Sequence, residues 1–71
     1  MLNIKIYKIS EIFENNQPCR YWGVFEYERD LNNYLVSHQM IEKFTDPETA
    51  TKKMQEMNSS VAYENYLNRL K

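Results

Sequence analysis

The single cysteine of the chain, Cys19, excludes the cross-links on which a protein of this length usually depends. A chain of 71 residues buries only about 60% of the surface that its unfolded form exposes, so its core alone leaves a few kcal/mol of net stability. One cysteine forms no disulfide within the chain. With His38 it makes two soft metal ligands, whereas a structural zinc site normally needs about four. We therefore expect self-association or a partner protein to supply additional stability, with no cofactor and no metal.

The first eight residues alternate polar and apolar side chains and contain no continuous apolar segment. We therefore expect neither a signal peptide nor a membrane span. Together with the unpaired thiol, this pattern predicts a cytoplasmic protein. The chain contains no repeat and no linker, so residues 1–71 are predicted to form one small domain.

Two segments with alternating character, residues 2–14 and 20–29, flank Asn15-Asn16-Gln17-Pro18 and predict a β-hairpin. We expect a register that sets aromatic residues and opposite charges against each other, because such pairs stabilise a sheet. The expected pairs are Tyr7 with Tyr27, Ile9 with Phe25, Phe13 with Tyr21, Lys8 with Glu26, and Glu14 with Arg20.

The segment Asp30-Leu31-Asn32-Asn33 predicts a turn, because Asn and Asp accept left-handed backbone and make local hydrogen bonds. Residues 34–44 then predict a third strand, although a helix over residues 31–44 is the alternative. We prefer the strand. Its residues on the face of Tyr21, Phe25 and Tyr27 would be Tyr34, Val36, His38 and Met40.

Thr45-Asp46-Pro47-Glu48 predicts the start of a helix, either with a capping box from Thr45 to Glu48 or with Asp46 as the cap before Pro47. One apolar stripe follows, formed by Ala50, Met54, Met57 and Val61.

A second apolar stripe lies almost opposite the first and consists of Tyr63, Tyr66, Leu67 and Leu70. Either the helix breaks at Ser59-Ser60, or one continuous helix has two apolar sides. The sequence thus predicts an α+β fold, in which a three-stranded antiparallel sheet is packed by a C-terminal helix and followed by a second helical segment.

Both faces of the predicted sheet are apolar, and one helix can cover only one of them, so a large apolar area would remain exposed. The face that the helix is expected to cover holds Tyr7, Ile9, Phe13, Tyr21, Phe25, Tyr27, Val36 and Met40. The opposite face holds Ile4, Ile6, Ile12, Trp22, Val24, Leu35 and Ile41. If the chain turns back at Ser59-Ser60, residues 61–71 would cover the opposite face and complete the core, which is the interpretation we prefer. Otherwise the surplus apolar surface would be an interface with a partner or a second copy.

No pattern in the chain indicates catalysis. His38 has no nucleophile or orienting carboxylate supplied by a sequence motif, so we expect a structural histidine on the aromatic face. Arg20 could lower the thiol pKa of Cys19, but we expect an incidental cysteine. Gly23 is the only glycine, which excludes a glycine-rich phosphate loop. We expect a protein that is not an enzyme.

Glu26, Glu28 and Asp30 alternate along a predicted strand, so their carboxylates point the same way at about 6.6–7 Å intervals. This interval is close to the separation of successive phosphates in a nucleic acid. The row could therefore mimic a phosphate backbone, or it could be a solvated strand face.

Nine basic residues stand against ten acidic ones, with a net charge of −1 and no long basic run. This balance counts against nucleic-acid binding. The stretch Phe44-Thr45-x-Pro47-Glu48-x-Ala50 after a strand resembles the three-strand-plus-helix modules with which recombinase arms read DNA. Because the strand residues expected to be exposed are acidic and aromatic, we do not carry that function over.

We therefore predict a non-catalytic regulator or inhibitor, encoded by a phage or mobile element, that docks on a larger protein such as a nucleic-acid enzyme or a defence nuclease. The alternatives are a small nucleic-acid-binding sheet module and a structural homodimer. We expect no membrane partner. The predicted partner-binding residues are Trp22, Glu26, Glu28, Asp30, Tyr63, Tyr66, Leu67 and Leu70.

Overall fold

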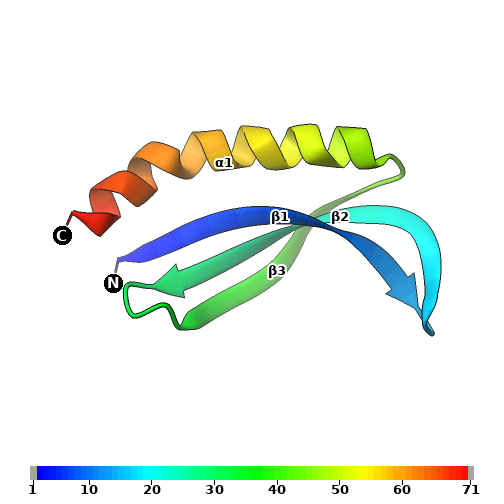
Figure 1. Cartoon of the computed structure of the whole chain (residues 1–71), viewed down its shortest axis with the longest axis horizontal. Coiled ribbons are helices and arrows are strands. Elements are labelled where there is room, and N and C mark those ends of the chain that lie inside the picture. Colours follow the sequence, from blue (N-terminus) through cyan, green and yellow to red (C-terminus); the bar gives the residue numbers. More distant parts are fainter. Residues whose placement is uncertain (1, 71) are drawn as a thin grey trace.

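A computed structural model describes residues 2–70 as three strands and one helix (Figure 1). The strands are β1 (Asn3–Glu14), β2 (Gln17–Asp30) and β3 (Leu35–Phe44), and the helix is α1 (Pro47–Arg69). The strands pair antiparallel in the order β1-β2-β3. The predicted α+β fold and its three-stranded antiparallel sheet are confirmed, and residues 35–44 form a strand in place of the alternative helix.

The first hairpin has a tighter turn than expected. Asn15 and Asn16 both adopt left-handed backbone, with φ of 53° and 64°, which is the conformation of a two-residue hairpin turn. Extra residues of β2 then lie between Pro18 and Trp22, where Arg20 has a φ of 58°.

The predicted register of this hairpin is wrong for all five pairs, because the tight turn and the irregularity in β2 together shift it. The observed partners are Ile6 with Tyr27, Tyr7 with Glu26, Lys8 with Phe25, Ile9 with Val24, Phe13 with Pro18, and Glu14 with Gln17.

A shift of one residue moves every side chain of a strand to the other face of the sheet. The face that α1 covers therefore holds both Tyr7 of β1 and Val24 of β2. The prediction that these two residues lie on opposite faces is wrong. Tyr7, Val24 and Ala50 are the buried apolar residues of the core. Ile9, Trp22, Phe44, Met54, Met57 and Val61 pack around them.

The second hairpin has the predicted turn. The backbone N–H of Asn33 donates to the Asp30 carbonyl at 2.9 Å, and the N–H of Asp30 donates to the Tyr34 carbonyl at 3.0 Å. Asn33 takes the left-handed conformation, with a φ of 68°, which asparagine accepts readily.

Of the two predicted starts of the helix, the structure shows the one with Asp46 as the N-terminal cap before Pro47. The Asp46 carboxylate accepts from the backbone N–H and the hydroxyl of Thr49, both at 2.8 Å, and Pro47 occupies the first turn. The hydrogen bond from the Thr49 backbone lowers the pKa of Asp46 below its ordinary value.

The predicted second helical segment is wrong, because α1 continues through Ser59 and Ser60 to Arg69. The stripe that faces the sheet does not end at Val61. It continues with polar side chains, Asn65 and Asn68, in positions where the sequence pattern lacks apolar residues.

Three asparagines of α1 bind the outer edge of β1, and one of them, Asn68, donates to the Asn3 carbonyl at 2.9 Å. Asn58 accepts from the Tyr7 backbone N–H at 2.8 Å and donates to the Tyr7 carbonyl at 3.0 Å. Asn65 makes the same two contacts with Lys5, at 3.0 and 2.7 Å. Each amide thus satisfies backbone groups that a neighbouring strand would otherwise satisfy. We call Asn58 and Asn65 the amide clamp.

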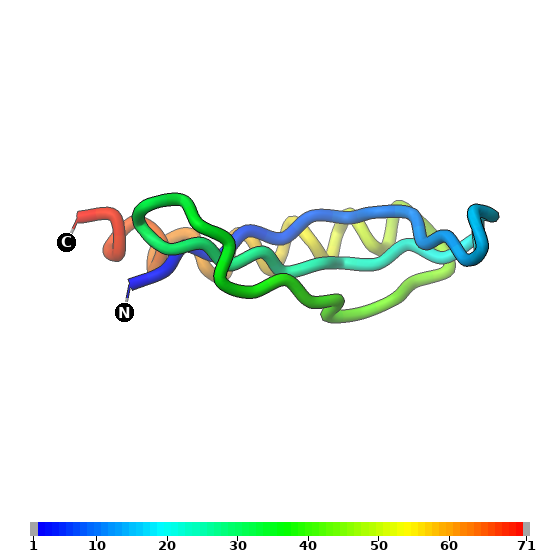
Figure 2. Tube along the Cα trace, turned by 90° about the horizontal axis from the view of Figure 1, so that it is seen from below, coloured from blue at the N-terminus to red at the C-terminus, as the bar shows by residue number. Residues whose placement is uncertain are grey.

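The molecule is elongated. Its extents are 42 × 24 × 12 Å and its radius of gyration is 13.7 Å, against roughly 11 Å for a compact chain of this length. The helix runs beside β1 (Figure 1) and lies behind the strands in Figure 2, which looks onto the uncovered side of the sheet. One face of the sheet is therefore open over its whole length.

Removing one half of the amide clamp is expected to destabilise the domain. The variant Asn65→Ala deletes two hydrogen bonds at a side chain that is 8% exposed. It also leaves the Lys5 backbone N–H and carbonyl without a partner, so we expect a loss of about 2–3 kcal/mol in urea unfolding. Gln55→Ala, at an exposed amide of the same helix, is the control and should change stability by less than about 0.5 kcal/mol. Equal unfolding midpoints for the two variants would contradict this role.

Candidate functional site: the open face of the sheet

The open face is the set of strand side chains directed away from α1. Because strand side chains alternate between faces, the register assigns each residue to one side. The open face comprises Ile4, Ile6, Lys8 and Ser10 of β1, Tyr21, Gly23, Phe25, Tyr27 and Arg29 of β2, and Leu35, His38, Met40 and Lys43 of β3.

Charge is divided unequally between the two faces. The open face carries three bases, Lys8, Arg29 and Lys43, and no acid among the thirteen positions named above; Glu14 continues the same alternation at the hairpin end of β1, beyond the register shift. The side facing the helix carries one base, Lys5. Its acids are Glu11, Glu26, Glu28, Asp30 and Glu42. The net charge of −1 therefore conceals a basic face, and the composition argument against anionic ligands does not apply to it.

Aromatic rings occupy the middle of the open face. Tyr27 and His38 are stacked, with ring centroids 4.4 Å apart and planes at 15°, and His38 lies 5.6 Å from Phe25. His38 thus shares a face with Phe25 and Tyr27, as expected, but α1 leaves this face uncovered, whereas the prediction placed it under the helix. The Lys8 ammonium lies 5.5 Å from the Tyr27 ring centroid, so a cation borders the rings.

Gly23 makes room for one of these rings. A Cβ atom at this position would lie 2.8 Å from Cε2 of Phe25 and 3.1 Å from Sδ of Met40. Both distances are shorter than an ordinary contact, so a larger residue would displace the Phe25 ring. Glycine thus allows the ring to lie close against the sheet.

The open face also exposes apolar side chains. Ile6 is 40% exposed, Leu35 is 48% exposed and Met40 is 49% exposed. Scattered apolar residues are normal on a protein surface, but a contiguous group beside aromatic rings is typical of a binding site.

The predicted acidic row lies on the other side of the sheet, and Glu26 is 8% exposed. Its carboxylate accepts from the Tyr7 hydroxyl at 2.7 Å and from the Gln39 amide at 3.1 Å. The Tyr7 hydrogen bond lowers the pKa of Glu26. Burial and the same hydrogen bond raise the pKa of Tyr7 to about 12. Glu26 therefore helps to hold β1, β2 and β3 together.

The other two acids of the row also bind within the chain. Glu28 accepts from the Asn3 side-chain amide at 2.6 Å. Asp30 accepts from the backbone N–H groups of Asn32 and Tyr34, at 2.9 and 3.0 Å. These contacts assign both carboxylates to local structure.

The remaining predicted partner residues occupy two separate places. Trp22 is half-buried and packs against the core, whereas Tyr63, Tyr66, Leu67 and Leu70 are exposed on the side of α1 away from the sheet. We call these four residues the outer helix stripe. Tyr63 and Tyr66 stack within it at 6.5 Å. The structure therefore does not bring the stripe together with Trp22 or with the acidic row.

Cys19 is less reactive than its neighbour Arg20 suggests. Its Sγ lies 3.6 Å from a carboxylate oxygen of Glu14. Desolvation and this contact raise the thiol pKa, so the idea that Arg20 lowers it is wrong. A raised pKa disfavours the nucleophilic thiolate.

Within residues 2–70, no three His, Cys, Asp or Glu side chains are grouped so that they could hold a metal ion. The helix in this part of the chain lacks the apolar length needed to cross a membrane. Comparison with protein-family models, curated proteins and solved structures found no match. The geometry of the site is therefore the basis for assigning a function.

The bases of the open face are not among the binding residues predicted from the sequence. One signal was available on β2, where the acids Glu26, Glu28 and Asp30 all take even positions. The odd positions hold Tyr21, Phe25, Tyr27 and Arg29. Between residues 21 and 30, the acids are thus separated from Arg29 and from three of the four aromatic rings, Trp22 being the exception.

The hydrogen bond between Tyr7 and Glu26 predicts a dependence of stability on acid pH. Because folding lowers the pKa of Glu26 below its ordinary value of 4.5, its contribution is full above pH 4.5 and is lost as the pH falls through the folded-state pKa. In urea unfolding, Tyr7→Phe should lower stability by about 1.5–3 kcal/mol at neutral pH. Its difference from the wild type should shrink in acid.

The control for this measurement is Tyr34→Phe, because Tyr34 is 71% exposed. The stability of Tyr34→Phe should equal that of the wild type at every pH. A Tyr7→Phe deficit that stays constant down to about pH 3 would show that Glu26 is not responsible.

Proposed function

We propose that this protein is a non-catalytic binding domain that holds single-stranded nucleic acid on the open face of its sheet. The observation that carries the proposal is the combination on one face of three bases with stacked aromatic rings, where Glu14 at the hairpin end of β1 is the one acid on the same alternation. Bases supply attraction to phosphates, and rings supply contact with nucleobases.

The spacing of the rings supports a strand whose bases are spread apart. Alternate residues of a β-strand are about 6.6–7 Å apart, which is close to the separation of successive phosphates in an extended nucleic acid. Phe25 and Tyr27 follow each other at this interval on β2, and His38 of β3 stacks on Tyr27. Base stacking on rings of this kind accepts any sequence.

The cations border the rings on both sides. Lys8 lies on β1 beside Tyr27, and Lys43 lies on β3 with its ammonium 4.6 Å from the Tyr21 ring centroid. A backbone that crosses the face would thus meet positive charge on each side of the bases. The rings lie against the sheet, which suits bases that are free of a duplex partner.

The outer helix stripe supports a second candidate function, in which the domain is a regulator or inhibitor that docks on a larger protein, such as a nucleic-acid enzyme. Tyr63 is 71% exposed, Tyr66 is 56% exposed and Leu70 is 66% exposed. Tyrosine-rich apolar surfaces are typical of protein interfaces. Binding through this stripe would depend little on salt, because its contacts are apolar.

The salt dependence of oligonucleotide binding tests the first candidate. A labelled oligothymidylate should bind at about 50 mM salt with a dissociation constant on the order of 10 μM. The logarithm of its affinity should fall with the logarithm of salt with a slope of about −2, because three cations each contribute about −0.7 on a single strand.

Variants of single lysines sharpen this test. Lys43→Glu should weaken binding about tenfold at low salt, whereas Lys52→Glu, on the exposed side of α1, should change it less than about twofold. Equal effects of the two variants, or no binding at about 50 mM salt, would remove this candidate and leave the protein-binding one.

The contribution of stacking is tested separately from charge. Tyr27→Leu keeps an apolar side chain but removes the ring that stacks on His38. We expect a loss of about 1–3 kcal/mol in oligonucleotide affinity with an unchanged salt slope. Tyr63→Leu, which removes an exposed ring of the outer helix stripe, should bind as the wild type does. An altered slope for Tyr27→Leu would mean that the ring acts through the position of Lys8.

A further inference from the structure

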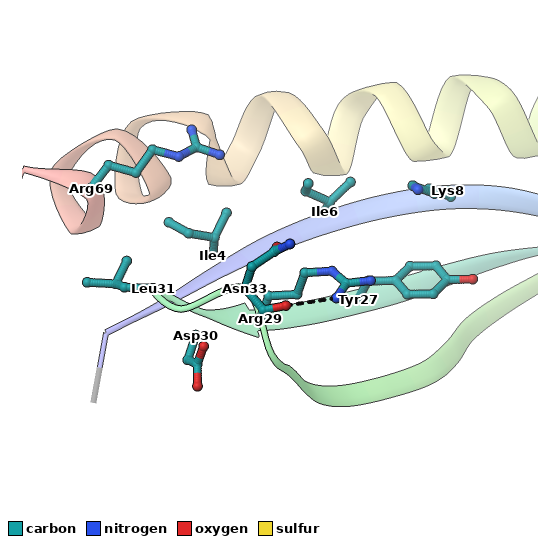
Figure 3. A pocket seen from close by; sticks show the side chains of 9 residues that line it. All are labelled: Ile4, Ile6, Lys8, Tyr27, Arg29, Asp30, Leu31, Asn33 and Arg69. Atoms are coloured by element: carbon teal, nitrogen blue, oxygen red, sulfur yellow. Dashed lines mark hydrogen bonds between the residues drawn. The ribbon is translucent and has the colours of Figure 1, made fainter.

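A cavity of about 330 Å³ lies at one end of the open face, beside the turn between β2 and β3 and the C-terminal end of α1 (Figure 3). This volume is at the lower end of the roughly 300–1,000 Å³ typical of small-molecule sites. The cavity is lined by Ile4, Ile6, Lys8, Tyr27, Arg29, Asp30, Leu31, Asn33 and Arg69.

The cavity is positively charged. Lys8, Arg29 and Arg69 contribute three cations, and Asp30 is the one acid of the lining. The Asp30 carboxylate accepts two backbone N–H groups of the turn and points away from the other lining side chains in Figure 3. The turn thus fixes the position of this carboxylate, and the lining keeps an excess of two positive charges, three cations against one acid.

One of these cations is held in place. The Arg29 guanidinium donates from Nη1 to the Asn33 carbonyl at 3.1 Å (Figure 3). This contact uses one of its five N–H donors and leaves the others for a ligand. Planar guanidinium groups match the geometry of phosphate oxygens, with which they form paired hydrogen bonds.

The other walls of the cavity are apolar or aromatic. Ile4, Ile6 and Leu31 come from β1 and the turn, and Tyr27 belongs both to this cavity and to the ring cluster of the open face. A ligand that fits must therefore combine a flat or apolar part with an anionic group. A nucleobase joined to a phosphate has this composition.

We propose that this cavity binds a single nucleotide that carries a terminal phosphate, either free or at the end of a strand lying on the open face. The base would contact Tyr27, and the phosphate would be held by Arg29 and Arg69. The strand-end form rests on the proposed function, whereas the free-nucleotide form does not.

The number of cations favours a terminal phosphate over an internal one. An internal phosphodiester carries one negative charge, whereas a phosphomonoester carries between about −1.5 and −2 at neutral pH. Three cations around one small cavity match the larger charge. Arg69 comes from the helix and is not part of the open face, so it adds charge only at this end.

The experiment compares four probes on the full chain by fluorescence anisotropy and competition. The probes are an oligothymidylate with unmodified ends, the same oligonucleotide with a phosphate at its 5′ end, the same with a phosphate at its 3′ end, and free thymidine monophosphate with thymidine as its reference. We expect one phosphorylated end to bind about tenfold more tightly than the unmodified strand. We also expect the monophosphate to compete where thymidine does not.

Two variants test whether the tighter binding of a phosphorylated end depends on Arg69. Arg69→Gln should abolish the advantage of the phosphorylated end while keeping the affinity for the unmodified strand within about twofold. Arg20→Gln is the matched control, because Arg20 lies in β2 close to the Asn15-Asn16 turn and does not line the cavity. The β1–β2 turn and the β2–β3 turn are at opposite ends of the sheet (Figure 1), so this variant should keep the advantage.

The outcomes separate this proposal from the proposed function. Binding of all oligonucleotides with equal affinity, without competition by the monophosphate, would overturn the cavity proposal and leave the open face as a nucleic-acid site. Binding of the monophosphate alone, lost in Arg69→Gln, would support the cavity and overturn the proposed function. A phosphate advantage that survives in Arg69→Gln would overturn the assignment to this cavity.

Discussion

The structure depends on how the side chains of Asn58 and Asn65 pair with the backbone of β1. Each amide both donates to and accepts from one residue of the strand, as another strand would. Few apolar residues are fully buried, since Tyr7, Val24 and Ala50 form the buried core. Directional hydrogen bonds to β1 therefore add to the packing of this small core in fixing the position of the helix.

This position of the helix explains how the two faces of the sheet differ. The face beside α1 holds the core and the acids, and Glu26 is stabilised there by the Tyr7 hydroxyl and by Gln39. The face away from α1 receives Lys8, Arg29 and Lys43 together with three aromatic rings and His38. A nearly neutral chain thus presents a basic, aromatic surface on one side, and this surface and the cavity at its end are the basis for the functions proposed above.

The sequence was sufficient for the elements but not for their register. The turn at residues 30–33, the Asp46 cap and the third strand follow from local chemistry, and all three are confirmed. The hairpin register was wrong because it depends on a two-residue turn at Asn15-Asn16 and on the left-handed Arg20, which residue alternation does not reveal. The predicted break of the helix at Ser59-Ser60 was wrong, because the side of α1 that faces β1 continues with asparagines, and a search for apolar periodicity does not count asparagines. The basic face could be found only once the strands had been aligned.

Sheet edges also bear on how this protein behaves when many copies are crowded together. An exposed strand edge can recruit strands from neighbouring molecules and start fibril growth. Between Lys5 and Tyr7, the edge of β1 is already occupied by helix side chains. At the opposite edge of the sheet, β3 carries the extra residues Val36 and Ile41 at its register shifts. Such irregularities twist an edge strand, so that it pairs less readily with a flat strand. A chain with so small a core thus carries structural protection against ordered aggregation at both margins of its sheet.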